Sequence, residues 1–187
     1  MIWKLGQTVE IETEHYRLRS LVESDATDRY LQWIKNPDVN QYLEVRLYDS
    51  SIQTIKAFIS SHDNQSSFLL GMIDKEDNSH VGNYSARCDS YHKTATLGVM
   101  IGDRKHWGRR IVIETRSAVL DFLFTQLDIL KVHGACYSNN VPAIYNYKAQ
   151  GFECEGILKS HRFSGNKRVD VMMFAMSRDA WMGARNT

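Results

Sequence analysis

The sequence has almost no net charge, few cysteines and no long apolar run. Lys+Arg 23 against Asp+Glu 22 leaves a formal net charge of +1, whereas a protein that binds nucleic acid by electrostatics usually shows a basic excess. No apolar stretch approaches the roughly 18 residues of a membrane-spanning helix, and the first ten residues lack the apolar core of a signal peptide. Cys88, Cys136 and Cys154 are odd in number and widely spaced, which predicts buried, reduced thiols in a cytoplasmic protein rather than disulfides or a metal site.

The most informative stretch runs from Thr94 to Tyr137. Thr94–Gly102 is short, apolar and β-branched, which predicts a buried strand. Asp103–Arg110 is a turn with four cationic side chains, and Ile111–Leu127 contains no Gly or Pro and has apolar residues at helical spacing. Leu130–Tyr137 is a second apolar run. Strand, helix and strand predict a crossover between parallel strands, with an anion site at the amino end of the helix.

The flanking segments predict further strands and helices of one mixed α+β domain, residues 1–187. We expect edge strands over Thr8–Glu12 and Tyr16–Leu21, and a helix from an N-cap at Ser24 to about Lys35. A short helix over 39–45, a helix capped by Ser50 and Ser51, and strands over Phe68–Ile73 and His80–Cys88 follow. Asn140 and Pro142 begin a short helix that ends at Gly151. Phe152–Phe163 and Val169–Met176 then flank a hairpin turn.

The order of these elements and several literal strings resemble the GCN5-related N-acetyltransferase (GNAT) superfamily, in particular its RimJ/RimL-like branch. The strings include Trp33–Val39, Ile101-Gly102-Asp103, Trp107-Gly108-Arg109, Asn140 to Phe152 and Gly165–Val171. The resemblance implies a GNAT fold. This is a mostly antiparallel sheet of about seven strands, splayed between the fourth and fifth. It also implies acetyl-CoA as the donor and a primary amine as the acceptor.

The resemblance assigns donor-binding roles to residues around the basic turn. Met100 and Ile101 are expected to offer strand backbone to the pantetheine arm. Lys105, Gly108 and Arg110 occupy the conserved positions of the family's pyrophosphate motif, and Arg109 lies among them. Most relatives have Gly or Ala where this chain has Arg110, and an arginine there can grip the phosphates or fill their site. Asn140 is expected to hold a pantetheine amide or simply to cap its helix.

The same resemblance makes Tyr147 the general acid that protonates the departing thiolate, and a phenol with a pKa of about 10 suits that role. The alternative is an ordinary core tyrosine, and Tyr145 is the nearest rival. Many relatives carry a glutamate base near Thr96, where threonine cannot replace it. The base is therefore left open among His92, Asp89, His80 and Glu44. Glu44 and Arg46 are expected to face the acceptor pocket, or else to be surface residues.

The leading prediction is an acetyl-CoA-dependent N-acetyltransferase in which the amine attacks the thioester directly. The acceptor is a protein N-terminus or a small amine such as an amino sugar. The rival is a non-catalytic binding or scaffolding domain of the same fold, with the cofactor turn altered at Arg110. RNA binding through 104–110 is a third reading, which the near-neutral charge disfavours. We expect no metal, no nucleic acid, no membrane, and a monomer or homodimer.

Overall fold

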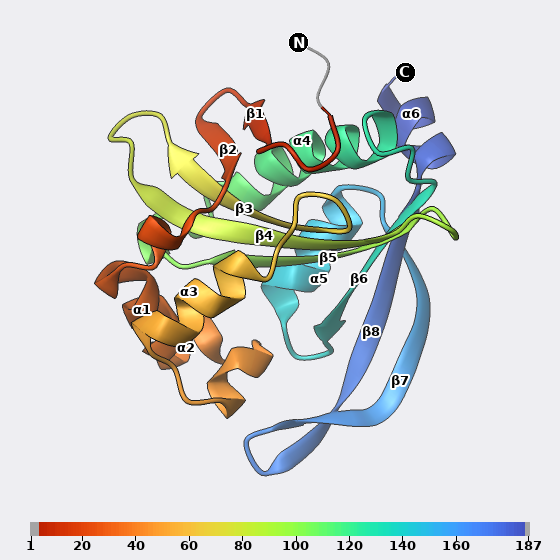
Figure 1. Ribbon diagram of the computed structural model, residues 1–187. Coiled ribbons are helices and arrows are strands. Elements are labelled where there is room, and N and C mark those ends of the chain that lie inside the picture. The colour runs from red at the N-terminus through yellow and green to blue at the C-terminus, as the bar shows by residue number, and fades with distance from the viewer. Residues whose placement is uncertain (1–3, 186–187) are drawn as a thin grey trace.

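The computed structural model describes residues 4–185, which form a single curved sheet with helices on both faces (Figure 1). The strands are β1 (Glu10–Glu12), β2 (Tyr16–Ser20), β3 (Ser67–Asp74), β4 (His80–Asp89), β5 (Thr94–Ile101), β6 (Lys131–Tyr137), β7 (Glu153–Ser164) and β8 (Lys167–Ser177). The helices are α1 (Asp28–Lys35), α2 (Pro37–Asn40), α3 (Ile52–Ser60), α4 (Ile111–Thr125), α5 (Val141–Ala149) and α6 (Arg178–Arg185). Short 3₁₀ segments lie at Glu23–Asp25, Glu44–Leu47 and Arg104–His106.

The sheet has eight strands in the order β1-β2-β3-β4-β5-β6-β8-β7, one for each of the eight strand segments expected from the sequence, whereas the resemblance implied about seven. Every neighbouring pair is antiparallel except β5 and β6, which are joined through α4. The predicted crossover and the mixed α+β class are therefore confirmed. The hairpin is confirmed too: β7 and β8 turn through Gly165, and Figure 1 shows them projecting beyond the rest of the sheet.

Two apolar cores lie on opposite faces of the sheet. The larger packs α4 against the central strands through Val119, Leu120 and Leu123, which are fully buried. The smaller lies under α1, α2 and α3 and includes Tyr30, Trp33 and Ile55. Each buried aliphatic side chain contributes roughly 1.5–3 kcal/mol relative to exposure. These cores fix both faces of β5, the strand on which the site is built.

Three helix boundaries differ from the sequence-based expectation. The helix expected from Ser24 begins at Asp28, because Thr27 caps it by accepting a hydrogen bond from the Tyr30 amide, and Ser24 lies in a 3₁₀ turn. The helix expected over 39–45 is divided into α2 and the 3₁₀ segment Glu44–Leu47. Asn36 caps α2 at the Asp38 amide, 2.9 Å away, which starts the helix at Pro37.

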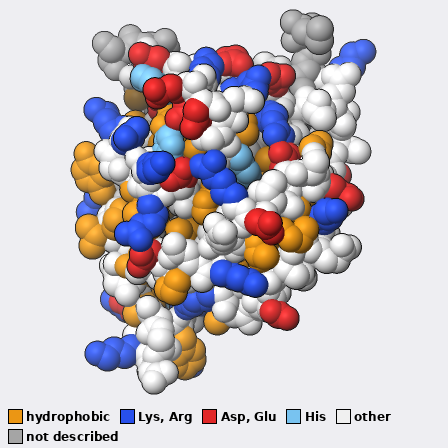
Figure 2. Space-filling model, turned by 90° about the vertical axis from the view of Figure 1, so that its left-hand side faces the viewer, with side chains coloured by type: hydrophobic (Ala, Val, Ile, Leu, Met, Phe, Trp, Pro, Cys, Tyr) orange, Lys and Arg blue, Asp and Glu red, His pale blue; other side chains and the backbone are white. Residues whose placement is uncertain are grey.

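Charged side chains of both signs are interspersed on the surface seen in Figure 2. This mixture agrees with the near-zero net charge of the sequence. Among residues 4–185, no helix is long and apolar enough to cross a membrane.

Candidate active site

The central feature of the site is the gap that opens between β5 and β6. The two strands pair over only three positions, from Thr94–Lys131 to Thr96–His133, and then separate. The Gly102 amide donates to Val81 of β4, so the preceding carbonyl, that of Ile101, points away from β4 and accepts from the Trp107 indole at 3.0 Å. Backbone N–H and C=O groups point to alternate sides along a strand, so those of Ile101 and Val99 face the gap.

The same alternation separates the two strand residues expected to contact the donor. The backbone of Ile101 faces the gap, whereas the backbone of Met100 faces β4. Val99, which the sequence reasoning did not single out, takes the position expected for Met100. Met100 instead lines the pocket described below. Counting back two residues from Ile101 would have identified Val99.

The turn after β5 exposes backbone amides at the amino end of α4. Within residues 4–185, no hydrogen-bond acceptor is found for the amides of Arg110, Ile111 and Val112. Gly108 and Arg110 both have left-handed backbone, with φ of 75° and 60°. A Cβ on Gly108 would meet nothing within 4 Å. The free amides and the helix dipole make this corner attractive to anions.

Buried contacts hold this turn against the sheet. His106 is 6% exposed, its Nδ1 lies 3.1 Å from the Tyr16 hydroxyl, and its Nε2 lies 3.6 Å from Asp74. Asp103 accepts from Arg29 at 2.5 Å and from the Lys105 amide at 3.0 Å. The turn is therefore fixed by side chains from β2, β3 and α1 before any ligand binds.

Three of the four cationic side chains of the turn are exposed and unpaired. Arg104 forms an ion pair with Asp38 at 2.5 Å. Lys105, Arg109 and Arg110 are exposed, and none forms an ion pair within the described part of the chain.

Tyr147 lies on the α4 side of the gap. Its ring stacks on Phe174 with centroids 4.6 Å apart, and the guanidinium of Arg116 lies 4.4 Å from its centroid. A Cβ built on Gly134 would be 2.3 Å from the Tyr147 hydroxyl and 2.9 Å from the Leu97 carbonyl oxygen. The hydroxyl thus reaches the point where β5 and β6 separate. Tyr145, the rival, is 66% exposed.

Burial raises the pKa of Tyr147, and the positive charge of Arg116 opposes this shift. Arg116 is itself 2% exposed, and its Nη1 has no hydrogen-bond partner among the described residues. A buried cation above the ring stabilises negative charge on the phenol oxygen. Tyr147 is therefore protonated at neutral pH, with a buried cation beside its ring.

Asn140 caps α5, as the ordinary reading of the residue expected. Its Oδ1 accepts from the Ala143 amide at 3.2 Å. The cap uses the oxygen of the side-chain amide and leaves its nitrogen as the group that a donor could contact.

A pocket of about 510 Å³ lies on the opposite face, between α1, the 3₁₀ segment Glu44–Leu47, α3 and strands β4 and β5. It is lined by Tyr30, Ile34, Leu43, Glu44, Val45, Tyr48, Asp49, Ser50, Thr54, Ile55, Phe58, Asn83, Ser85, Gly98, Val99 and Met100. The lining is mostly apolar and aromatic, and its charged members are Glu44 and Asp49. Because it includes Gly98, Val99 and Met100, it borders the strand that forms one edge of the gap.

The two residues expected at the acceptor pocket have different surroundings. Glu44 lines the pocket and accepts a hydrogen bond from the Tyr137 hydroxyl at 2.7 Å. Arg46 is not among the lining residues. Its guanidinium donates to the carbonyl oxygens of Phe163, at 2.7 Å, and Gln41. Arg46 thereby ties the segment Glu44–Leu47 to the β7–β8 hairpin.

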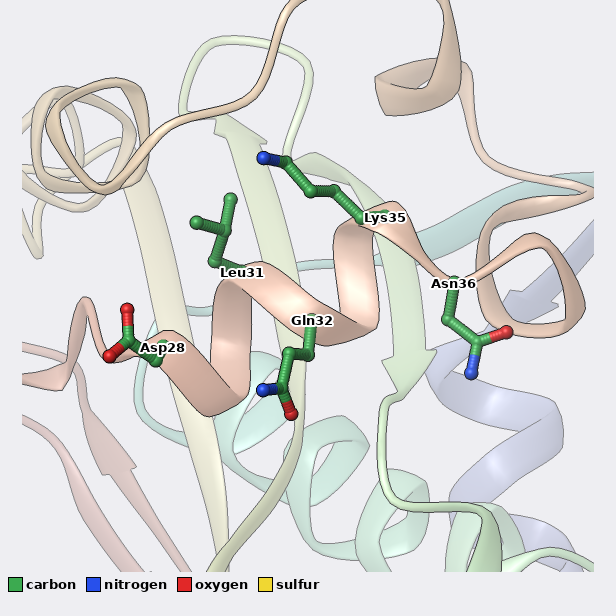
Figure 3. Close-up of a pocket in the computed structure, with 5 residues that line it drawn as sticks. All are labelled: Asp28, Leu31, Gln32, Lys35 and Asn36. Atoms are coloured by element: carbon green, nitrogen blue, oxygen red, sulfur yellow. The ribbon is translucent and has the colours of Figure 1, made fainter.

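A second depression, about 590 Å³ in volume, lies on the outer side of α1 (Figure 3). Asp28, Leu31, Gln32, Lys35 and Asn36 line it, so it belongs to one helix and its end. It shares no lining residue with the first pocket.

The candidate bases from the sequence do not meet at the gap. His92 and Asp89 lie at the β4–β5 connection, where Asp89 accepts from the His92 amide. His80 is packed against Tyr30 and Trp33, and burial lowers its pKa to about 4. Glu44 is at the pocket but already accepts from Tyr137.

The three cysteines form no disulfide within the described residues, but only two of them are buried or half-buried as expected. Cys136 is buried and Cys88 half-buried, and burial raises the pKa of each thiol to about 11. Cys154 is exposed, contrary to expectation, because β7 is an edge strand. Two thiols that stay protonated are poor nucleophiles. Residues 4–185 contain no cluster of His, Cys, Asp or Glu that could hold a metal ion.

Comparison with known proteins decides the family. The family model described as an acetyltransferase (GNAT) domain matches residues 15–153. The chain belongs to the GNAT acetyltransferases. It is 24% identical to an uncharacterized N-acetyltransferase, p20, of Bacillus licheniformis, over 91% of this chain and 97% of the relative.

Solved structures of GNAT enzymes share the fold. RimL, a ribosomal L7/L12 α-N-protein acetyltransferase solved with coenzyme A, matches with a TM-score of 0.82 and 19% identity, covering 92% of this chain and 99% of RimL. The spermidine N-acetyltransferase of Vibrio cholerae, solved with CoA and spermine, matches with a TM-score of 0.79 and 19% identity, covering 90% of this chain and 98% of that one.

Family membership makes the protein an acetyl-CoA-dependent N-acetyltransferase, and the GNAT geometry of this chain fits the donor. At the amino end of α4, where a pyrophosphate is expected to bind, lie backbone amides without an acceptor and three cations without an ion pair among the described residues. The gap between β5 and β6 presents the backbone of Val99 and the amide of Ile101 to an extended amide-containing arm, while the Ile101 carbonyl is already bound by Trp107.

Proposed function

We propose that this acetyltransferase acetylates a primary amine, carried by a small molecule or a protein N-terminus, that binds in the pocket lined by Glu44 and Asp49. The observation that carries the proposal is that this pocket borders Gly98–Met100, the stretch of β5 that also forms one edge of the donor gap. An amine in the pocket and a thioester in the gap would therefore meet across one strand.

The chemistry of the pocket supports an amine acceptor. Carboxylates at Glu44 and Asp49 attract a protonated amine, and Tyr48, Phe58 and Ile55 offer apolar surface to the carbon body that carries it. Burial raises the pKa of Tyr30 to about 12, so this phenol is neutral in the pocket wall.

The donor side is assigned to the residues at the turn. Lys105, Arg109 and Arg110 would bind the phosphates together with the amides at the start of α4, and Gly108 lets the chain pass close to them. Val99 and Ile101, with the Asn140 side-chain nitrogen, would hold the pantetheine arm. Acetyl-CoA supplies an activated acetyl group with a thiolate leaving group.

Tyr147 is proposed as the general acid. Its hydroxyl lies against Gly134, at the closed end of the gap, and its ring is held by Phe174 and Arg116. A proton given by this hydroxyl to the departing sulfur leaves a phenolate beside a buried guanidinium.

Acceptor identity is tested with a panel of amines. Release of free CoA is followed with spermidine, with glucosamine and with a short peptide that has an N-terminal alanine. The same peptide with an acetylated N-terminus is the control. We expect turnover with at least one free amine and none with the blocked peptide. Equal rates with the blocked and free peptides would exclude the N-terminus as acceptor.

The alternative, a non-catalytic binding domain of the same fold, rests on Arg110. It predicts that CoA does not raise the melting temperature. A ligand that binds the folded state must raise it in a concentration-dependent way. Because Arg110 is exposed and unpaired, we expect such a shift with both CoA and acetyl-CoA.

A further inference from the structure

Acetylation of an amine needs a proton acceptor, because an amine attacks only when neutral. His92 and Asp89 lie at the β4–β5 connection, and His80 is packed under α1. None of these groups lies at the closed end of the gap, where β5 and β6 separate.

The last paired position of β5 and β6 carries two polar side chains that face each other. Thr96 and His133 are in register, and the Thr96 hydroxyl oxygen lies 3.2 Å from Nε2 of His133. Thr96 is exposed and His133 half-buried. One residue further along each strand, Leu97 and Gly134 border the gap.

This pair lies on the opposite face of the sheet from Tyr147. Side chains alternate along a strand, so His133 and Gly134 point to opposite faces. A Cβ on Gly134 would meet the Tyr147 hydroxyl. His133 therefore points to the other face, and Thr96 lies on the same face as Gly98, which lines the acceptor pocket.

We propose that Thr96 and His133 together are the general base: the Thr96 hydroxyl takes the proton of the amine and passes its own proton to Nε2 of His133. This assignment rests on the proposed function. It gives a role to Thr96, which has no basic group of its own, because an imidazole behind the hydroxyl can hold a proton near neutral pH.

The residues that take up and give the protons lie on opposite faces of the sheet. A protonated amine first loses one proton to solvent as it enters the site. From the neutral amine, acetyl transfer forms a nitrogen–carbon bond, breaks a carbon–sulfur bond, removes one proton from the nitrogen and adds one to the sulfur. His133 gains the proton of the amine through Thr96, and Tyr147 gives a proton to the sulfur. Afterwards His133 is an imidazolium and Tyr147 a phenolate, and exchange with water restores both.

The charged groups near the pair are few. Arg87 lies opposite Thr96 on β4, and Lys131, two residues before His133, forms an ion pair with Glu155 at 2.6 Å. On the far side, β8 places Ala175 beside His133, and Glu153 of β7 lies beyond it. These groups share the face of the pair.

The kinetic test uses three single variants and one double variant. With spermidine and the alanine-terminated peptide as acceptors, we expect Thr96→Val and His133→Gln each to lower kcat by about 10²-fold, the lower end for general acid–base catalysis. The KM for acetyl-CoA should change little, and Thr96→Ser should keep most of the rate. The double variant should be no slower than the slower single variant, because the two groups act as a unit. An unchanged kcat in the single variants would refute the proposal. A loss in the double variant equal to the product of the two single losses would also refute it.

A second measurement needs neither acceptor nor donor. The nitrogen chemical shifts of His133, assigned by comparison with His133→Gln, report which ring nitrogen carries the proton. If the Thr96 hydroxyl donates to Nε2, the wild-type ring carries its proton on Nδ1, and Thr96→Val removes this preference. A proton on Nε2 in the neutral wild-type ring would overturn the proposal. Absence of turnover in the wild-type protein would instead refute the proposed function and leave this result standing.

Discussion

Replacing Arg110 with glycine tests whether this residue is strained and whether it binds phosphate. Arg110 is the residue before α4 and has φ 60° and ψ 14°, the left-handed region. That backbone costs a non-glycine residue about 1–2 kcal/mol. The extra freedom of glycine in the unfolded chain offsets about 0.5–1 kcal/mol. We therefore expect Arg110→Gly to stabilise the fold by about 0.5–1 kcal/mol, or about 1–4 °C for a chain of this size.

The same change removes a cation from the phosphate corner. Arg110 is exposed and forms no ion pair among the described residues, so its loss disrupts no internal contact of that kind. If it binds phosphate, CoA affinity should fall by about 5-fold, equivalent to about 1 kcal/mol. Stability and affinity should thus move in opposite directions.

Two control variants separate the effects. Arg109→Gly removes the neighbouring cation, but Arg109 is not among the residues with positive φ, so this variant should lower the melting temperature. Arg110→Lys keeps charge and backbone strain, so melting temperature and affinity should change little. Differential scanning fluorimetry and calorimetric titration with CoA measure both quantities. A fall in melting temperature for Arg110→Gly as large as for Arg109→Gly would refute the strain argument. Tighter CoA binding by Arg110→Gly would show that the arginine side chain obstructs the phosphate site.

Three further substitutions and one control variant test the site and the fold. Tyr147→Phe should lower kcat by about 10²-fold with little change in CoA affinity, since the ring still stacks on Phe174; an unchanged kcat would remove Tyr147 as the acid. Gly134→Ala should displace the Tyr147 hydroxyl and lower both kcat and stability, the latter by about 1–3 kcal/mol, whereas Gly156→Ala, which meets open space, should be close to neutral in both assays. The lowered pKa of His80, about 4, means that its stabilising effect is present above pH 6.5 and is lost as the pH falls toward 4. Urea unfolding should show a loss of up to about 3 kcal/mol over that range, and a smaller one for His80→Gln; identical pH profiles would contradict the burial argument.

The elements that local signals define were predictable. Apolar runs, the Gly-free stretch from Ile111 and the turn at Gly165 indicated the crossover and the hairpin, and the structure has both. Predictions were wrong where two capping residues competed within a few positions. Thr27 rather than Ser24 caps α1, and Asn36 begins a new helix directly after α1 ends. Single-sequence patterns do not rank such nearby caps, because the choice depends on packing against the sheet.

The sequence by itself determined the fold class, the family resemblance and the cationic turn, because these depend on residues close together along the chain. The tertiary structure alone decided which strand amides face the gap, which cations are free, and that Thr96 meets His133. Those two residues are 37 positions apart and share no motif. They meet because β5 and β6 pair in one parallel register, and a shift of one residue would turn His133 to the other face. Register is a property of the whole packed sheet, and it places the imidazole of His133 beside the hydroxyl of Thr96.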